Sequence, residues 1–201
     1  LEGVDGCGKS TQAAMLFEWF KQQKLDFIQV REPGGTVTGE AVRQILLHNC
    51  SALGLQTELL LYMAARAELT EQVIIPALKS GKVVLADRFT DSTMAYQGYG
   101  GGTSLQWIRT LNKNVTRGIK PDITILLDLP VEEAARRRGK TADRMESRDL
   151  NYHRRVRRGY LELAAAEPQR IKVVNAAADQ NEIHAMICCL LEEFALKAGG
   201  F

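Results

Sequence analysis

The residues nearest the amino end combine glycines with a lysine and a serine at a spacing that suits phosphate binding. Gly3, Gly8, Lys9 and Ser10 fit the pattern G-x-x-x-x-G-K-[ST] within the stretch LEGVDGCGKSTQ. Glycines let the backbone approach an anion closely, so that successive N–H groups converge on phosphate oxygens. The lysine would reach the outer phosphates of a nucleotide, and the serine hydroxyl would ligate Mg²⁺. We therefore predict a phosphate-binding loop over residues 3–11; the alternative is an ordinary glycine-rich turn before a helix.

Charged and glycine-rich segments also follow two apolar runs further along the chain. FIQV at 27–30 precedes REPGGT, and VVLA at 83–86 precedes DRFTDSTMAYQGYGGG, which begins at Asp87. In a parallel sheet the carboxyl ends of the strands share one edge, where ligands bind. Asp87 is thus expected to hold the hydration shell of the metal opposite Ser10. The alternative is an aspartate that ends a strand or caps a helix.

The elements that must position these residues alternate along the sequence. Besides 27–30 and 83–86, apolar runs at 123–129 and 171–174 predict strands. Segments of helical period separate these runs, which indicates an α/β fold with a parallel sheet and helices on both faces. The helices are expected at 9–24, 38–49, 56–80, 104–117, 131–138, 147–166 and 180–197.

A single domain is expected over residues 1–201. The chain has 201 residues and 45% apolar content, which is enough for one packed core. Only Leu1 and Glu2 precede the predicted phosphate loop, and there is no initiator Met. We therefore expect the sequence to begin inside a longer natural chain, with its N-terminal strand truncated.

The composition argues against a membrane protein and against a nucleic-acid-binding protein. The sequence has no run of about eighteen apolar residues, and its net charge is only +2. Arginines are concentrated between 136 and 158, in one glycine-interrupted segment rather than interleaved with aromatic residues. We therefore expect a polyanion near that segment. The four cysteines lack metal-ligand spacing and are expected to be reduced.

Six motifs spread over nearly the whole chain resemble those of the thymidylate kinase family, the dTMP kinases among the nucleoside monophosphate kinases. They read EGVDGCGKSTQ, REPGGT, LYMAARAEL, DRFTDSTMAYQG, KPDITILLDL, and DRME followed by YLELA. The resemblance implies a P-loop NTPase-type three-layer fold with a five-stranded parallel sheet and a mobile lid. It also implies a cytoplasmic homodimer that uses ATP and Mg²⁺ to convert dTMP to dTDP in dTTP synthesis.

Positions that match the family's motifs are expected to have the family's roles in binding ATP, the phosphoryl donor. Lys9 would hold the phosphates of ATP, and Ser10 and Asp87 would hold Mg²⁺. Asp5 would lie near the 3′-hydroxyl of the acceptor sugar. The ATP-binding residues implied in this way are Gly3, Val4, Asp5, Gly6, Cys7, Gly8, Lys9, Ser10 and Thr11.

The acceptor side follows from the resemblance in the same way. Tyr62 stands where relatives usually stack a phenylalanine on thymine, and Arg66, one helical turn on, would hydrogen-bond the base edge. Tyr96 would crowd the 2′ position of the sugar and so favour deoxyribose. The implied dTMP-binding residues are Asp5, Arg31, Pro33, Arg43, Tyr62, Arg66, Arg88, Ser92, Thr93, Tyr96 and Gln97, with Arg31, Arg43 and Arg88 around the phosphate.

The phosphate loop departs from one branch of the family, which carries an arginine where this chain has Gly6, Cys7 and Gly8. The stretch RRRGKTADR, within a lid expected over 136–149, resembles the other branch, which supplies the arginine from above. Positive charge beside the moving phosphoryl group is worth about 10³-fold or more in rate. The implied catalytic residues are Lys9, Asp5, Arg88, Arg138 and Arg144, whereas Arg136 and Arg137 are expected to be solvated.

Two other functions fit part of the pattern. A kinase for another nucleoside monophosphate would use the same donor residues, because only Tyr62, Arg66, Thr93 and Tyr96 favour thymine. A switch protein that hydrolyses GTP would need the guanine-reading motif N-K-x-D. The stretch NKNV at 112–115 lacks the aspartate.

Overall fold

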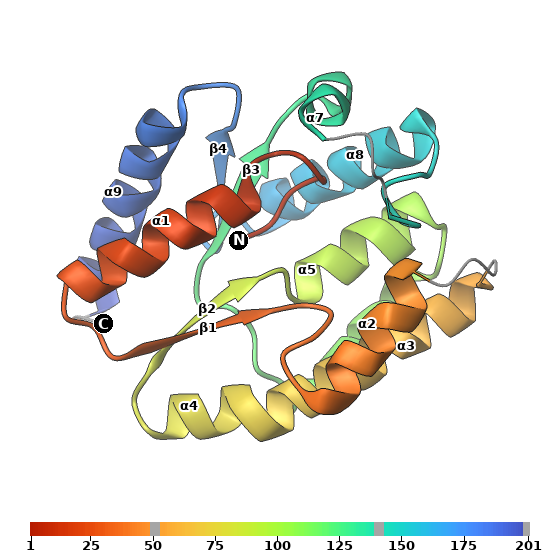
Figure 1. Cartoon of the computed structure of the whole chain (residues 1–201), viewed down its shortest axis with the longest axis horizontal. Helices are drawn as coiled ribbons and strands as arrows, with labels where there is room; N and C mark the ends of the chain where they lie inside the picture. Colours follow the sequence, from red (N-terminus) through yellow and green to blue (C-terminus); the bar gives the residue numbers. More distant parts are fainter. Residues whose placement is uncertain (49–52, 139–142, 199–201) are drawn as a thin grey trace.

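In the part of the chain that the structure describes, four strands form two parallel pairs (Figure 1). The computed structural model describes residues 1–48, 53–138 and 143–198. Within these ranges, β1 (Phe27–Arg31) pairs with β2 (Val83–Asp87), and β3 (Thr124–Asp128) pairs with β4 (Ile171–Asn175). Both pairs are parallel and in register along their whole length. The four predicted strands are therefore confirmed, with ends that differ by a single residue.

The predicted five-stranded sheet is not confirmed, because the described residues hold two separate pairs of strands. Leu1 nevertheless hydrogen-bonds with the backbone on either side of Asp87. Its amino group donates to Ala86 O at 2.7 Å, and Arg88 N donates to Leu1 O at 3.0 Å. Glu2 exchanges two backbone bonds of 2.9 Å with β3 on its other side. Glu2 makes only an isolated parallel bridge with Leu126, so a fifth strand is absent from the described residues.

Helices occupy most of the predicted positions. The helix expected at 56–80 is confirmed as continuous helical structure from Leu55 to Lys79, but it contains a π-helical turn at Thr70–Ile74 that the sequence did not predict. Residues 90–100 are helical although the glycine-rich sequence gave no apolar period there. The helices are α1 (Lys9–Gln22), α2 (Val37–His48), α3 (Leu55–Leu69), η1 (Thr70–Ile74), α4 (Ile75–Lys79), α5 (Thr90–Thr93), η2 (Met94–Gly100), α6 (Leu105–Val115), α7 (Val131–Arg137), α8 (Leu150–Ala166) and α9 (Gln180–Ala198).

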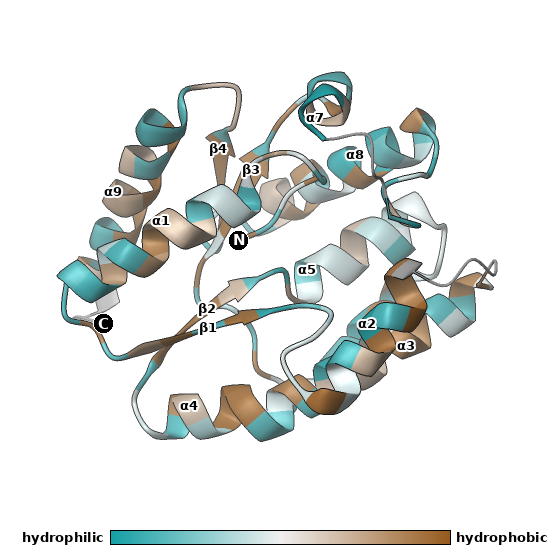
Figure 2. Ribbon diagram, viewed as in Figure 1, coloured by the Kyte–Doolittle hydropathy of each residue, from teal (hydrophilic) through white to brown (hydrophobic). Residues whose placement is uncertain are grey.

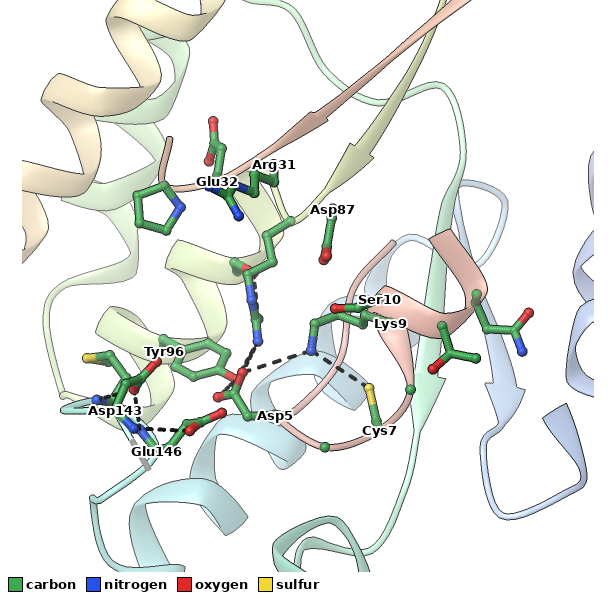
Figure 3. Close-up of a pocket in the computed structure, with 18 of the residues that line it drawn as sticks. Asp5, Cys7, Lys9, Ser10, Arg31, Glu32, Asp87, Tyr96, Asp143 and Glu146 are labelled. Carbon is green, nitrogen blue, oxygen red and sulfur yellow. Dashed lines mark hydrogen bonds and ion pairs between the residues drawn. The ribbon is translucent and has the colours of Figure 1, made fainter. Parts of the chain in front are cut away.

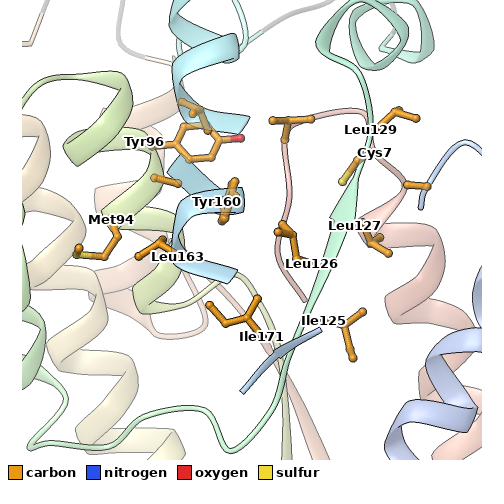
Figure 4. Packing of buried hydrophobic residues seen from close by; sticks show 14 of the residues in the cluster. Cys7, Met94, Tyr96, Ile125, Leu126, Leu127, Leu129, Tyr160, Leu163 and Ile171 are labelled. Carbon is orange, nitrogen blue, oxygen red and sulfur yellow. The ribbon is translucent and has the colours of Figure 1, made fainter. Parts of the chain in front are cut away.

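The core lies on both sides of β3, because successive side chains of a strand point to opposite faces. Leu126 points toward Leu163 of α8, whereas Ile125 and Leu127 point the other way (Figure 4). The helices α1 and α9 cover that second face (Figure 1). Figure 2 shows hydrophobic residues along the strands and more hydrophilic ones on the outer turns of α7 and α8. Within the described ranges, no helix is both long enough and apolar enough to cross a membrane.

Candidate active site

A cavity of about 790 Å³ opens at the carboxyl ends of β1 and β2, beside the loop that precedes α1. Most of the predicted site residues line it, although they come from distant parts of the sequence. The expected residues Gly3, Val4, Arg138 and Arg144 are not among those lining it. The predicted residues that do line it are Asp5, Gly6, Cys7, Gly8, Lys9, Ser10, Thr11, Arg31, Pro33, Arg43, Tyr62, Arg66, Asp87, Arg88, Ser92, Thr93, Tyr96 and Gln97.

The loop before α1 is a backbone cradle that larger residues would obstruct. Gly6 has a φ of 87°, and a Cβ there would collide with the backbone oxygen of Ala134. Gly8, the residue before α1, has a φ of 100°, a conformation that L residues rarely adopt. No atom lies within 4 Å of the position that a Gly8 Cβ would take. The loop thus brings the open start of a helix, with its unpaired N–H groups, to the cavity.

Lys9 lies inside this cradle and is buried. Its Nζ donates to the backbone oxygens of Gly3 and Val4 at 3.0 Å each, and it lies 4.0 Å from Asp5 Oδ1. Gly3 and Val4 therefore hold the lysine through their backbone and do not line the cavity themselves. The ammonium group points toward the loop interior, where an anion in the cradle would meet it (Figure 3).

Asp5 and Tyr96 lie next to each other in the cavity (Figure 3), and Arg88 contacts both of them. Arg88 Nη2 forms a short ion pair with Asp5, and Tyr96 Oη donates to Asp5 Oδ2 at 2.6 Å. Arg88 has a φ of 69°, unusual for a residue with a side chain, as is common at functional sites. The cluster joins the cradle to the segment that follows β2.

The charges around Asp5 decide its protonation state. Burial raises the pKa of Asp5, but the nearby charges of Arg88 and Lys9 outweigh burial and hold that pKa well below its ordinary value of 3.8. Burial also raises the pKa of Tyr96 well above 10.0. At neutral pH the carboxylate is therefore ionised and accepts hydrogen bonds, while the phenol stays neutral and donates one.

Arg66 lines the cavity and is almost completely buried. Its guanidinium pairs with Glu32, which is also buried. The remaining N–H groups donate to Thr93 Oγ1 at 2.9 Å, to Asn112 Oδ1 at 2.6 Å and to the backbone oxygen of Phe89 at 3.0 Å. All five N–H groups thus have acceptors within the protein. The expected bond to a base edge would require one of these acceptors to be exchanged.

Comparison with known proteins identifies the family. The family model described as Thymidylate kinase matches residues 1–187. A thymidylate kinase from Kosmotoga olearia is 48% identical over 97% of this chain and 93% of that relative. One from Synechococcus sp. strain JA-3-3Ab is 48% identical over 98% of this chain and 96% of its own length.

The chain belongs to the thymidylate kinase family. A crystal structure of thymidylate kinase from Ehrlichia chaffeensis superposes with a TM-score of 0.80 and 34% identity over 95% of both chains. The fold is therefore that of thymidylate kinases, a P-loop NTPase-like α/β fold.

The arginines of the expected lid occupy three different environments in this member of the thymidylate kinase family. Residues 139–142 of the lid lie outside the described part of the structure. Arg138 packs against Gly6, and its Nη1 lies 3.5 Å from Glu146 O. Arg144 pairs with buried Glu58 at 2.7 Å. Arg137 is exposed, as expected, but it also lines the cavity and donates to Ala176 O at 2.8 Å.

The donor set at the cavity fits Mg²⁺, the metal expected of a thymidylate kinase. Asp87 Oδ1 is buried without a hydrogen-bond partner among the described residues, and Asp87 and Ser10 both line the cavity. A cluster of three or more acidic, histidine or cysteine ligands is absent from the described ranges. Mg²⁺ usually keeps several waters and takes one or two protein ligands together with phosphate oxygens, so two hydroxyl or carboxylate groups suffice.

The cavity also contains residues that the sequence did not single out. Glu32 belongs to the REPGGT motif, and Asp143, Met145 and Glu146 belong to the DRME motif, so the motifs themselves were the available signal. Residues 178–180 follow β4, and their place after a strand could have predicted them. Gln12 and Ile183, which are both buried, had no chemical signal. The other lining residues that the sequence did not single out are Leu47, Ala178, Asp179 and Gln180.

Proposed function

We propose that this protein transfers the γ-phosphoryl group of ATP to dTMP, giving ADP and dTDP for dTTP synthesis. The observation that carries the proposal is one cavity that contains both the phosphate cradle and the Asp5–Arg88–Tyr96 cluster. A donor phosphate in the cradle and an acceptor nucleotide beside Arg88 would lie in the same space. Such proximity is the main requirement of direct phosphoryl transfer.

The chain's own residues would position and neutralise the reacting groups. Lys9 would hold the outer phosphates of ATP, and Arg88 would hold the acceptor phosphate together with Arg31 and Arg43. Ionised Asp5 keeps Arg88 oriented and would accept a hydrogen bond from the 3′-hydroxyl of the sugar. Mg²⁺, held by Ser10 and Asp87, would neutralise phosphate charge when bound. The reaction would pass directly from donor to acceptor without a covalent enzyme intermediate.

Tyr62, Arg66, Ser92, Thr93, Tyr96 and Gln97 would surround the nucleoside part of dTMP, and all six line the cavity. The lid arginines Arg138 and Arg144 would supply further positive charge to the transferred phosphoryl group. Arg138 packs against Gly6 of the cradle, which supports this role, whereas Arg144 pairs with Glu58 of α3.

The proposal is tested by measuring ADP formation from ATP with dTMP, dUMP, dCMP, dGMP and AMP, each in turn, beside a control without acceptor. We expect dTMP to give the highest kcat/KM and the control to give almost no ADP. A higher kcat/KM for dGMP or AMP would identify a kinase for another nucleotide. ADP formation that does not depend on the acceptor would indicate a nucleotide hydrolase.

The homodimer belongs to the same proposal. Four apolar side chains of α2 and α3 are exposed, and the two helices lie side by side (Figure 1). Those side chains are Val37, Ile45, Leu55 and Leu60. A second copy would cover them, and light scattering would report twice the mass of one chain.

Two further expectations belong to the same proposal. A cytoplasmic location is proposed because both substrates are cytoplasmic nucleotides. A fifth strand is proposed at Leu1 and Glu2 because their backbone hydrogen bonds lie between β2 and β3.

A further inference from the structure

Glu58 is a buried carboxylate of α3 that the proposed reaction does not use. Only 1% of its side chain is exposed. Its Oε2 accepts from Arg144 Nη1 and from Arg148 Nη2 at 2.7 Å each, and its Oε1 accepts from Gln97 Nε2 at 2.9 Å. Because Arg144 and Arg148 both donate to this carboxylate, its oxygens act as acceptors. Whatever side chain meets Oε1 must therefore donate a hydrogen.

This contact fixes which way the amide of Gln97 faces. A glutamine has an NH₂ group that donates and an oxygen that accepts, and its hydrogen-bond partners decide the orientation. Because Glu58 requires the NH₂ group, the Oε1 of Gln97 is turned away from it. Gln97 lines the cavity, and no hydrogen bond among the described residues uses this oxygen. Gln97 therefore presents a hydrogen-bond acceptor, its Oε1, to the cavity.

Such an acceptor distinguishes between pyrimidines. The N3 atom of thymine and uracil carries a hydrogen, whereas N3 of cytosine is a lone-pair acceptor. Tyr62, the expected stacking residue, lies one helical turn after Glu58 on α3 and also lines the cavity. The amide of Gln97 and the plane of a stacked base are thus set by the same helix.

We propose that Glu58 is a positioning residue for base specificity: it holds Gln97 with its oxygen toward the base and so favours a base with a ring N–H over cytosine. This inference rests on the proposed dTMP kinase activity. A competing structural role is that Glu58 only ties Arg144 and Arg148 to α3. The two roles differ in whether base preference changes when Glu58 can donate a hydrogen.

The decisive variant is Glu58→Gln, measured as kcat/KM for dTMP, dUMP and dCMP. A glutamine at 58 can donate to Gln97 Oε1, so the amide of Gln97 can turn its NH₂ group toward the cavity. The ratio of kcat/KM for dTMP over dCMP should fall about tenfold to a hundredfold, because the Gln97 oxygen no longer faces the lone pair of cytosine N3 and an N–H donor faces it instead. The ratio for dTMP over dUMP should stay constant, since both bases carry the N3 hydrogen.

Two further variants separate specificity from stability. Leu191→Ala removes a buried side chain of α9 that does not line the cavity, so it should lower stability without changing either ratio. In a Gln97→Ala background, Glu58→Gln should no longer change the dTMP/dCMP ratio, because its effect passes through Gln97. A folded Glu58→Gln variant with the wild-type dTMP/dCMP ratio would overturn the inference. The wild-type preference for dTMP would still uphold the proposed function.

A measurement on the unmodified protein keeps the inference testable if Glu58→Gln does not fold. In the NMR spectrum of the dTMP complex, the side-chain NH₂ protons of Gln97 should show Overhauser contacts to the Cγ protons of Glu58. Contacts from those NH₂ protons to the base, in place of Glu58, would show that the amide has turned and would refute the proposal.

Discussion

The donor side and the acceptor side of the cavity are built in different ways. The cradle uses backbone conformation within a few consecutive residues, and Lys9 is held by the nearby carbonyls of Gly3 and Val4. The acceptor side uses ion pairs between residues far apart in sequence. Arg66 and Glu32 are 34 positions apart, and Arg148 and Glu58 are 90 positions apart. The two sides should therefore respond differently to substitution.

The two sides should respond differently because substitutions on each side leave different groups without a partner. Removing the Lys9 side chain leaves Gly3 O and Val4 O with other donors, Arg88 Nη1 and Cys7 N respectively, and leaves Asp5 paired with Arg88. Removing one partner of a buried ion pair leaves an uncompensated charge, which is much more costly than the pair itself is favourable. Donor-side variants should lose activity and keep their stability, whereas acceptor-side variants should lose both.

The largest expected effect is on the donor side, in Lys9→Ala. Removing the ammonium group should lower kcat about 10²- to 10³-fold, because positive charge at the outer phosphates stabilises the transition state. Chemical denaturation should show a change in unfolding free energy below about 1 kcal/mol. The matched control is Lys21→Ala, an exposed lysine at the other end of α1, which should leave both quantities unchanged. If folded Lys9→Ala has a normal kcat, the cradle does not contribute to catalysis.

Arg66→Met tests the acceptor side and should mainly destabilise the fold. It leaves Glu32 buried without its guanidinium partner, so unfolding free energy should fall by about 3 to 5 kcal/mol. Urea denaturation measures this loss. The double variant Arg66→Met/Glu32→Leu removes both charges and should recover part of the lost stability. If the single variant is as stable as the wild-type protein, the buried pair does not set the difference between the two sides.

This division also explains how much the sequence could predict. Local spacing was sufficient to predict the glycine-rich turn that enters α1, the position of Asp87 at the end of β2 and all four strands. The pairing of Arg66 with Glu32, by contrast, depends on how β1 and α3 pack, which no spacing encodes. Family motifs placed Arg66 in the cavity but did not reveal that its N–H groups are already used.

Two features of the fold escaped prediction for related reasons. The segment 90–100 is helical because buried side chains such as Tyr96 and Met94 hold it against the core, which overrides the low helix propensity of its glycines. The π-helical turn at Thr70–Ile74 has no marker in an otherwise regular helical pattern. Tertiary packing decides both, so neither is visible in local sequence.

The lid arginines sharpen the comparison, because Arg138 lies against the cradle and Arg144 pairs with Glu58. Replacing either by alanine should lower kcat about tenfold to a hundredfold with a smaller effect on the KM for dTMP. Only Arg144→Ala should also lower the unfolding free energy, since it takes one guanidinium from a buried carboxylate. Arg136→Ala, an exposed neighbour, is the control. An unchanged kcat in both variants would exclude these arginines from phosphoryl transfer.

The smallest expected effect concerns His153 of α8, which contacts Glu146, a residue that lines the cavity. Its ring Nε2 lies 3.3 Å from the backbone oxygen of Glu146, and the side chain is almost fully buried. Burial, followed by the charge of Arg138, lowers the pKa of His153 below its ordinary value of 6.5, while Asp5 and Asp149 oppose this shift. At neutral pH the ring is therefore uncharged.

A lowered histidine pKa makes stability depend on pH in a defined direction. Between the folded and unfolded pKa values the unfolded chain binds more protons, so the unfolding free energy rises with pH. The contribution of His153 is complete above the unfolded value of 6.5 and is lost as pH falls through the folded value. Urea denaturation between about pH 5 and 8 should show this decline, and His153→Gln should flatten it. His184→Gln should flatten the decline in unfolding free energy less, because that ring is only partly buried. An equal effect of the two variants would show that the burial of His153 beside Arg138 does not cause the pH dependence.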